Sequence, residues 1–242
     1  MSIPFAGQSS PESTPTLVIR PLPHGGKTRH QAVWYPPGYQ SASSKQWPLV
    51  VFLHGRGECG TEGSKQTAVG LVAAAQLNPA RWPAIIIAPQ KQGAEVQWGQ
   101  EDDYVDACIA AVLAEHNIDR SRIYLTGLSQ GGAGTWAIAA KHPELFAAIA
   151  PICGYGDPAA VADKLTGLPI WAFHGLKDTV VPPVQSQNMV EANIQRRAGK
   201  ASAVPAPKLT LFPEADHNSW DPAYRATGEA DLWLWLSSFS RK

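Results

Sequence analysis

The chain has 242 residues, with 20 Lys and Arg against 20 Asp and Glu, 21 Gly, 21 Pro and 9 Trp. This charge balance removes the electrostatic case for nucleic acid or an anionic membrane surface as partner. A chain of this length can bury a large core without disulfides or metals. The three cysteines, Cys59, Cys108 and Cys153, are an odd number without the close spacing of metal ligands. We therefore expect reduced thiols, and neither a metal nor an organic cofactor.

Two features of the sequence bear on domains and compartment. Residues 1–15 are rich in Ser, Pro, Gly and Thr and predict a flexible arm ahead of a single domain over 16–242. No apolar run approaches the roughly 18 residues that span a bilayer, and the start of the chain lacks the basic and apolar regions of a signal peptide. We expect a cytoplasmic protein, although a secreted enzyme without its leader would have the same sequence. The sequence gives no indication of the oligomeric state.

Strand-like and helix-like segments alternate along most of the chain. The first two strands are expected to pair in antiparallel fashion across a turn at residues 24–27. Helices are expected over 67–77, from Asp102 or Asp103 as the capping residue to about 117, and over 133–142 and 183–199, while the alternating segment 232–236 is assigned to a helix. Such alternation predicts an α/β fold with a mainly parallel sheet of about eight strands covered by helices on both faces. The expected strands are 16–20, 30–35, 48–53, 84–88, 122–126, 146–153, 168–173 and 208–212.

The segment from Gly127 to Gly132, Gly-Leu-Ser-Gln-Gly-Gly, lies between an expected strand and an expected helix. A serine at a sharp strand-to-helix turn, with glycines two residues to either side, is the pattern of a nucleophile elbow. The pattern alone is weak, but the strand before it and the helix after it strengthen the interpretation. We therefore take Ser129 as the candidate nucleophile, the alternative being a structural turn.

A serine hydroxyl needs a base to take its proton and an acid to orient that base. Asp178 and His217 each follow a late strand of the expected sheet, in the order nucleophile, acid, histidine that this kind of fold uses. Asp157 and Asp216 are the weaker alternatives for the acid. Among the other histidines, His54 and His174 are expected to hold loop geometry, and His24, His30, His116 and His142 have no evident pairing.

Acyl transfer also needs donors for an oxyanion. The backbone N–H of Gln130, directly after the serine, and that of Arg56, in the glycine-rich loop after strand 48–53, are the candidates. The Arg56 side chain could meet a substrate carboxylate or remain a solvated cation. Trp98 and Trp220 are candidates for lining the substrate pocket, although a tryptophan is more often part of a core.

These motifs resemble the compact α/β-hydrolases of the carboxylesterase and acyl-protein thioesterase group, with features of polyhydroxybutyrate-depolymerase-like and feruloyl-type esterases and of predicted peptidases. The resemblance covers the chain from about residue 48 to its end, and it implies Ser129, Asp178 and His217 as the triad with the Arg56 and Gln130 amides as the oxyanion hole. Leu128 departs from the phenylalanine often seen there in the thioesterases, which leaves the acyl group open. The motifs that carry the resemblance are residues 54–58, 127–132, 174–178 with 181–182, and 216–220.

The sequence thus predicts a serine esterase that cleaves small-molecule carboxylic esters through an acyl-enzyme intermediate. The short stretch between Gly154 and Gly167 leaves little room for a lid, so we expect an open cleft. The same triad cuts amides and thioesters, so a serine peptidase or an acyl-thioesterase is the alternative within enzymes. A catalytically silent binding module of the same fold is the alternative from another class.

Overall fold

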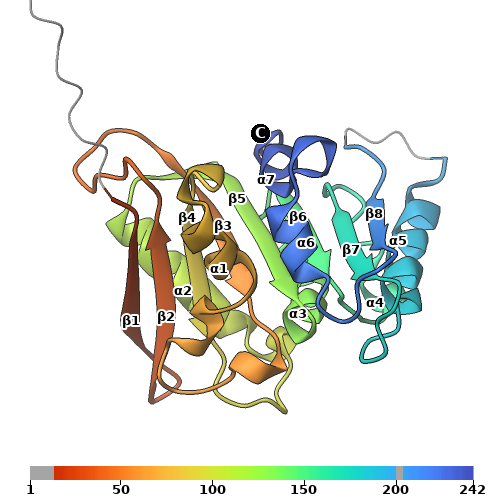
Figure 1. The fold of residues 1–242 in the computed structure, drawn as a ribbon, viewed down its shortest axis with the longest axis horizontal. Coiled ribbons are helices and arrows are strands. Elements are labelled where there is room, and N and C mark those ends of the chain that lie inside the picture. Colours follow the sequence, from red (N-terminus) through yellow and green to blue (C-terminus); the bar gives the residue numbers. More distant parts are fainter. Residues whose placement is uncertain (1–13, 200–203, 242) are drawn as a thin grey trace, which may run out of the picture.

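The computed structural model describes residues 14–199 and 204–241, and its core is a sheet of eight strands in the order β1-β2-β4-β3-β5-β6-β7-β8 (Figure 1). Strand β2 is antiparallel to both of its neighbours, and the pairs from β4 onward are parallel. The mainly parallel sheet expected from the alternation is therefore confirmed. The strands are β1 (Thr16–His24), β2 (Lys27–Tyr35), β3 (Trp47–Leu53), β4 (Ile85–Gln90), β5 (Ile118–Leu128), β6 (Ala148–Ile152), β7 (Trp171–Gly175) and β8 (Lys208–Phe212).

The first two strands form the expected hairpin. His24 pairs with Lys27, and Gly25 and Gly26 between them adopt positive φ angles of 59° and 72°. Glycine is favoured there because two-residue hairpin turns commonly need left-handed backbone, which side chains disfavour. The arm expected over residues 1–15 lies outside the described residues, apart from Thr14 and Pro15.

Helices cover both faces of the sheet. One face buries side chains of α2 (Asp102–Glu115), α3 (Gln130–Lys141) and α5 (Val184–Arg197), and the other those of α1 (Gly70–Leu77), α6 (Trp220–Arg225) and α7 (Leu232–Ser237). Strand β3 serves both cores, because Leu49 and Val51 point to the first and Val50 and Phe52 to the second. Two opposed apolar faces explain why β3 is a continuous apolar run. The short helix α4 (Pro158–Val161) stands in the connection between β6 and β7.

Three local expectations are corrected or sharpened. The helix expected from residue 67 begins at Gly70, whose φ of 60° breaks it from the preceding 3₁₀ turn Lys65–Thr67. Helix α2 is preceded by Glu101, so Asp102 and Asp103 lie in its first turn and neither is the capping residue. The segment Leu232–Ser237 is a helix, as expected, and the Asp231 side chain caps it by accepting the N–H of Leu234.

The sheet is least continuous between β6 and β7. These strands pair at Ile152 and Phe173, with an isolated bridge between Ile149 and Ile170, whereas β5–β6 and β7–β8 pair along their lengths. We call this boundary the β6–β7 seam. It separates strands β7 and β8, together with helix α5, from the other six strands of the sheet (Figure 1).

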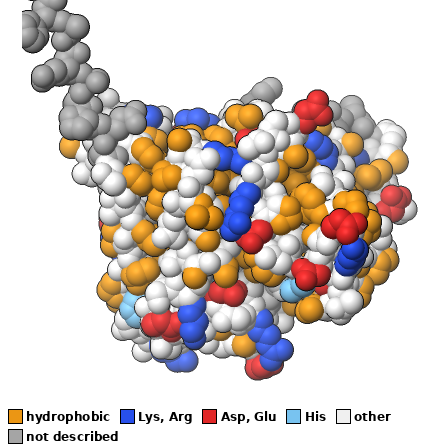
Figure 2. Space-filling view, viewed as in Figure 1, with side chains coloured by type: hydrophobic (Ala, Val, Ile, Leu, Met, Phe, Trp, Pro, Cys, Tyr) orange, Lys and Arg blue, Asp and Glu red, His pale blue; other side chains and the backbone are white. Residues whose placement is uncertain are grey.

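On the face shown in Figure 2, basic and acidic side chains are interspersed rather than gathered in a patch of one sign. Within the part of the chain that the structure describes, no helix is both long enough and apolar enough to cross a membrane. The three cysteines are unpaired, and Cys108 and Cys153 are buried.

Candidate active site

Ser129 stands at the sharp turn between β5 and α3, with φ 54° and ψ −116°. A side chain at positive φ is strained, and such residues concentrate at functional sites. The glycines around it are required by close packing: a Cβ on Gly131 would lie 1.9 Å from the carbonyl oxygen of Leu53, and one on Gly127 would lie 2.4 Å from that of Gly131. The two elbow glycines therefore allow α3 to start against the ends of β3 and β5.

The structure brings Ser129, His217 and Asp178 into one line of hydrogen bonds. Ser129 Oγ lies 2.9 Å from His217 Nε2, and His217 Nδ1 lies 2.7 Å from Asp178 Oδ2. Because an ionised carboxylate can only accept, Nδ1 carries the proton and donates it to Asp178, which leaves Nε2 to accept from the serine. The three residues come from the β5–α3 turn, the loop after β7 and the loop after β8, all at the carboxyl edge of the sheet.

The Asp178 carboxylate is buried, and both of its oxygens have hydrogen-bond partners. Its Oδ1 accepts the N–H groups of Val180 and Val181, each at 2.9 Å, and its Oδ2 is also 3.1 Å from His174 Nε2. Burial would raise the pKa of Asp178, but the hydrogen bonds from His217 and from these amides outweigh it and hold the pKa below its usual value. The carboxylate is therefore kept charged and fixed beside His217.

His174 holds this acid in place. Its Nε2 faces both Asp178 and the carbonyl of Val181, at 2.9 Å, while its Nδ1 is 2.7 Å from Ser186 Oγ. Nε2 faces two acceptors, so this nitrogen carries a proton and donates it, while Ser186 Oγ also donates to the Gly154 carbonyl at 3.2 Å. Burial lowers the pKa of His174. The structural role expected for His174 is what the structure shows.

His54 holds the loop after β3 in place through hydrogen bonds from both ring nitrogens. Lys91 N donates to His54 Nε2 at 2.9 Å, so Nδ1 carries the proton that meets the Gly55 carbonyl at 2.6 Å. Both bonds need a neutral ring, and burial lowers the pKa of His54 to about 4. The expectation that His54 holds loop geometry agrees with these contacts.

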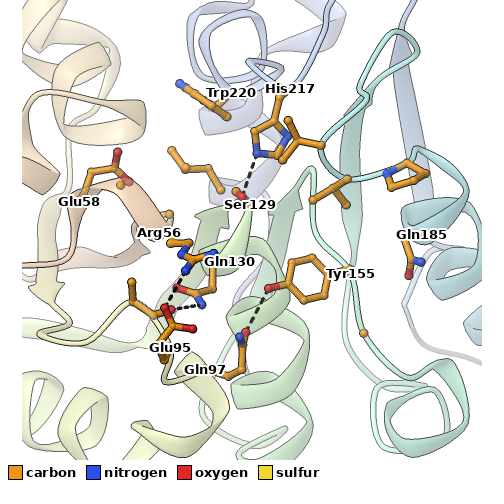
Figure 3. Close-up of a pocket in the computed structure, with 18 residues that line it drawn as sticks. Arg56, Glu58, Glu95, Gln97, Ser129, Gln130, Tyr155, Gln185, His217 and Trp220 are labelled. Atoms are coloured by element: carbon orange, nitrogen blue, oxygen red, sulfur yellow. Dashed lines mark hydrogen bonds and ion pairs between the residues drawn. The ribbon is translucent and has the colours of Figure 1, made fainter.

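The two expected oxyanion donors are the first residues of helical turns that begin beside Ser129. Arg56 begins the 3₁₀ turn Arg56–Glu58 and Gln130 begins α3, so the N–H of each lacks a partner within its own turn. Both residues line the same pocket as Ser129 and His217. The Arg56 guanidinium turns to Glu95, 2.6 Å away at the rim, and the Gln130 side chain donates to the Ala94 carbonyl at 3.0 Å (Figure 3).

The pocket around Ser129 has a volume of about 700 Å³. Trp220 lines it, edge-on to His217 with ring centres 5.5 Å apart. Trp98 does not line it, which corrects our expectation: its side chain is buried in the core and its indole N–H donates to the His54 carbonyl at 2.9 Å. The other pocket residues are Gly55, Gly57, Glu58, Ala94, Glu95, Gln97, Leu128, Tyr155, Gly156, Val180, Val181, Pro182 and Gln185.

Sequence reasoning had not singled out the polar side chains Glu58, Gln97 and Tyr155. Tyr155 OH donates to Gln97 Oε1 at 3.1 Å, which ties the loop after β6 to the loop after β4 (Figure 3). Glu58 belongs to a motif that the sequence did mark, and its place two residues after Arg56 was the available signal. What the sequence could not give was the direction in which these side chains point.

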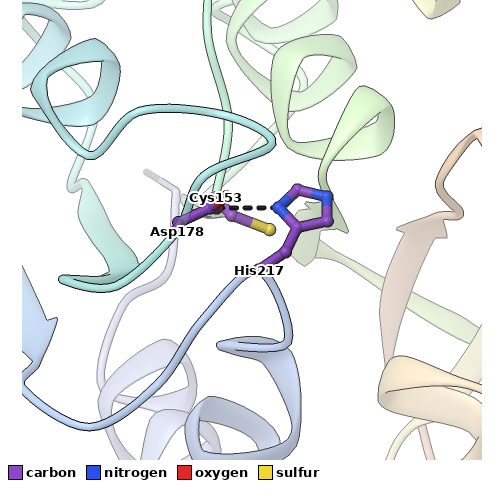
Figure 4. A group of neighbouring side chains, drawn as sticks. All are labelled: Cys153, Asp178 and His217. Atoms are coloured by element: carbon purple, nitrogen blue, oxygen red, sulfur yellow. Dashed lines mark hydrogen bonds and ion pairs between the residues drawn. The ribbon is translucent and has the colours of Figure 1, made fainter.

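Cys153 lies against the Asp178–His217 pair (Figure 4). Ligand atoms of these three residues fall within 4.8 Å of one another, which is the spacing of a metal site. Burial raises the pKa of the Cys153 thiol to about 12, whereas metal binding needs the thiolate. The backbone N–H of Ser129 donates to the Ile152 carbonyl at 2.9 Å and also meets the Cys153 thiol, with Sγ 3.2 Å from the nitrogen, so both residues help to hold the elbow.

Comparison with known proteins finds similar sequences and similar folds. The sequence model of the prolyl oligopeptidase family matches residues 92–167, which include the elbow. The chain is 28% identical to the "probable feruloyl esterase C" of Aspergillus terreus over 180 residues, 71% of this chain and 63% of that one. It is 31% identical to poly(3-hydroxyalkanoate) depolymerase C of Paucimonas lemoignei over 140 residues, 49% of this chain and 30% of that one.

Among solved structures, a thermostable esterase superposes with a TM-score of 0.77 at 30% identity, covering 93% of this chain and 63% of that one. The chain spans less than two thirds of the length of each of these three proteins. The strand order, the elbow and these similarities together show that the chain has the α/β-hydrolase fold.

Proposed function

We propose that this α/β-hydrolase is a serine esterase in which Ser129 is the nucleophile, His217 the general base and Asp178 the residue that orients His217. The observation that carries the proposal is the line of hydrogen bonds from Ser129 Oγ through His217 to Asp178, at 2.9 and 2.7 Å. A free serine hydroxyl is a poor nucleophile, and a neutral imidazole within hydrogen-bond reach is what activates it.

In the proposed reaction, Ser129 Oγ bonds to the ester carbonyl carbon while its proton passes to His217 Nε2. The carbonyl oxygen becomes an oxyanion, which the N–H groups of Arg56 and Gln130 stabilise by roughly 3 to 4 kcal/mol for each well-placed donor. The intermediate collapses by breaking the bond to the alcohol oxygen, which takes the proton from Nε2. Water then attacks the acyl-enzyme by the same route, releasing the acid and restoring Ser129.

Esters are favoured as the substrates because two of the similar proteins are named esterases and the third a polyester depolymerase. The match of residues 92–167 to the prolyl oligopeptidase family supports peptide hydrolysis as the second candidate. A thioester would engage the same three residues. Parallel assays with ester, thioester and aminoacyl amide substrates separate these activities.

Ser129→Ala tests the proposal. It removes the nucleophile, so we expect turnover of a short-chain p-nitrophenyl ester to fall by roughly 10⁴-fold or more. A fluorophosphonate probe should label the unsubstituted enzyme and fail to label Ser129→Ala. Ser237→Ala, on α7 with its hydroxyl bonded to the Leu234 carbonyl, is the matched control and should keep both activity and labelling. Retained activity in Ser129→Ala would refute the proposed nucleophile, and an unlabelled wild-type protein would favour a silent binding module.

A further inference from the structure

The Glu58 carboxylate lies beside the proposed nucleophile. A Cβ built on Gly55 would lie 3.1 Å from Glu58 Oε2 and 3.6 Å from the Cβ of Ser129, so both groups approach the same point above Gly55. In Figure 3, Glu58 is drawn to the left of Ser129 and Trp220 above it, whereas Arg56, Gln130 and Tyr155 are below it. Glu58 therefore borders the same pocket as Ser129, His217 and Trp220.

The backbone fixes this position. Glu58 is the last residue of the 3₁₀ turn that Arg56 opens, and its side chain is half-buried. Burial raises the pKa of Glu58, although the N–H groups of Gly55 and of Glu58 itself partly offset the rise by bonding the charged form. The carboxylate is thus attached to the loop that also carries the proposed oxyanion donor.

The charges that line the pocket do not balance. Arg56, Glu58 and Glu95 are its arginine and carboxylate residues, and Arg56 is paired with Glu95 on the side away from Glu58 (Figure 3). Across residues 14–199 and 204–241, no ion pair joins Glu58 to a basic side chain. A negative charge without a cation partner therefore faces the substrate space.

We propose that Glu58 selects the charge of the substrate, so that the pocket accepts neutral or cationic esters and disfavours esters that carry a carboxylate. This inference rests on the proposed esterase activity. By Coulomb's law, a unit charge on the substrate at ~6 Å from Glu58, in a partly hydrated pocket, changes kcat/KM on the order of three- to tenfold relative to a neutral ester. Added salt should reduce the discrimination, because the pocket is open to solvent.

The test uses two series of esters at about pH 8, where the carboxylate is ionised. In the first series, p-nitrophenyl esters of equal length carry an acyl chain that ends in methyl, carboxylate or trimethylammonium. In the second, acetate esters carry the same three groups on the alcohol, and acid release is followed by titration. The two series cover both ends of the substrate, and kcat/KM is measured for each ester.

For Glu58→Gln we expect the anion-to-neutral ratio of kcat/KM to rise about three- to tenfold in at least one series, and the cation-to-neutral ratio to fall. Glu58→Asp keeps the charge and should keep the preference of the wild type. Glu191→Gln makes the same change in net charge on α5, where Glu191 is exposed and bonded to Gln195, and it should leave the ratios unchanged.

Ratios of kcat/KM within one variant cancel any general loss of activity or of folded protein. A distorted loop that only lowers activity would therefore leave these ratios unchanged. Unchanged ratios in both series for Glu58→Gln would overturn the role of Glu58 while leaving the esterase proposal intact. A wild-type enzyme that hydrolyses none of the neutral esters would overturn the proposed function itself.

Discussion

Stability below neutral pH should depend on His54, which is fully buried at the end of β3. The folded protein holds the ring neutral, with a pKa of about 4, whereas a histidine in the unfolded chain titrates at about 6.5. Between these values the unfolded state binds a proton that the folded state does not, so the free energy of unfolding falls as pH falls. For this one group, the loss between about pH 7 and about pH 5 is about 2 kcal/mol.

The assay is urea unfolding at both pH values, followed by tryptophan fluorescence, for the wild type and for His54→Gln. The variant lacks the titrating group and should lose about 2 kcal/mol less than the wild type over this interval. Burial also lowers the pKa values of His116 and His174, so a residual loss is expected in both proteins. The difference between the two losses isolates His54.

Trp98→Phe is the matched control for this experiment. It deletes the indole N–H that donates to the His54 carbonyl, and so destabilises the same loop without removing a titrating group. Its unfolding free energy should be lower at both pH values, with the wild-type difference between them retained. A His54→Gln protein with the same pH dependence as the wild type would refute the reasoning.

Two further substitutions test the packing around the site. His174→Leu removes the N–H that faces Asp178 at 3.1 Å, and we expect about 2 kcal/mol lower stability in urea and a loss in kcat larger than the change in KM. His174→Gln, which keeps an N–H donor, should recover part of the stability and part of kcat. Equal stability and equal kcat in the two variants would contradict the role of His174 in positioning Asp178. Gly131→Ala puts a methyl group 1.9 Å from the Leu53 carbonyl oxygen and should yield little folded protein on expression. Gly57→Ala, whose new Cβ would meet nothing within 4 Å, should fold normally, and a stable Gly131→Ala would show that the elbow can relax.

The sequence was most informative where local chemistry alone decides the structure. The apolar run of β3, the Gly25-Gly26 turn and the small residues around Ser129 are patterns typical of a buried strand, a hairpin and an elbow, so these features could be predicted. The order of Ser129, Asp178 and His217, after the ends of β5, β7 and β8, then indicated that the three would meet, and in the structure they do.

Where tertiary packing decides, the sequence was less informative. Composition did not distinguish Trp98, whose indole is buried over His54, from Trp220, which lines the pocket. Helix α1 starts late because the backbone at Gly70 has a positive φ, which periodicity does not report. The loop of Glu58 was recognised, but the direction of that side chain depends on how the loop packs over Gly55.

The β6–β7 seam runs through the middle of the site. Ser129 and the loop of Arg56 are on the β5 side of it, whereas Asp178 and His217 follow β7 and β8. The 2.9 Å contact between Ser129 and His217 therefore joins two parts of the sheet that share few ladder bonds. Small sliding of one part against the other would change the distance between Ser129 Oγ and His217 Nε2 without altering any residue in the pocket. Substitutions under the seam, at positions such as Ile149 and Ile170, would act on this contact from outside the pocket, which neither residue lines.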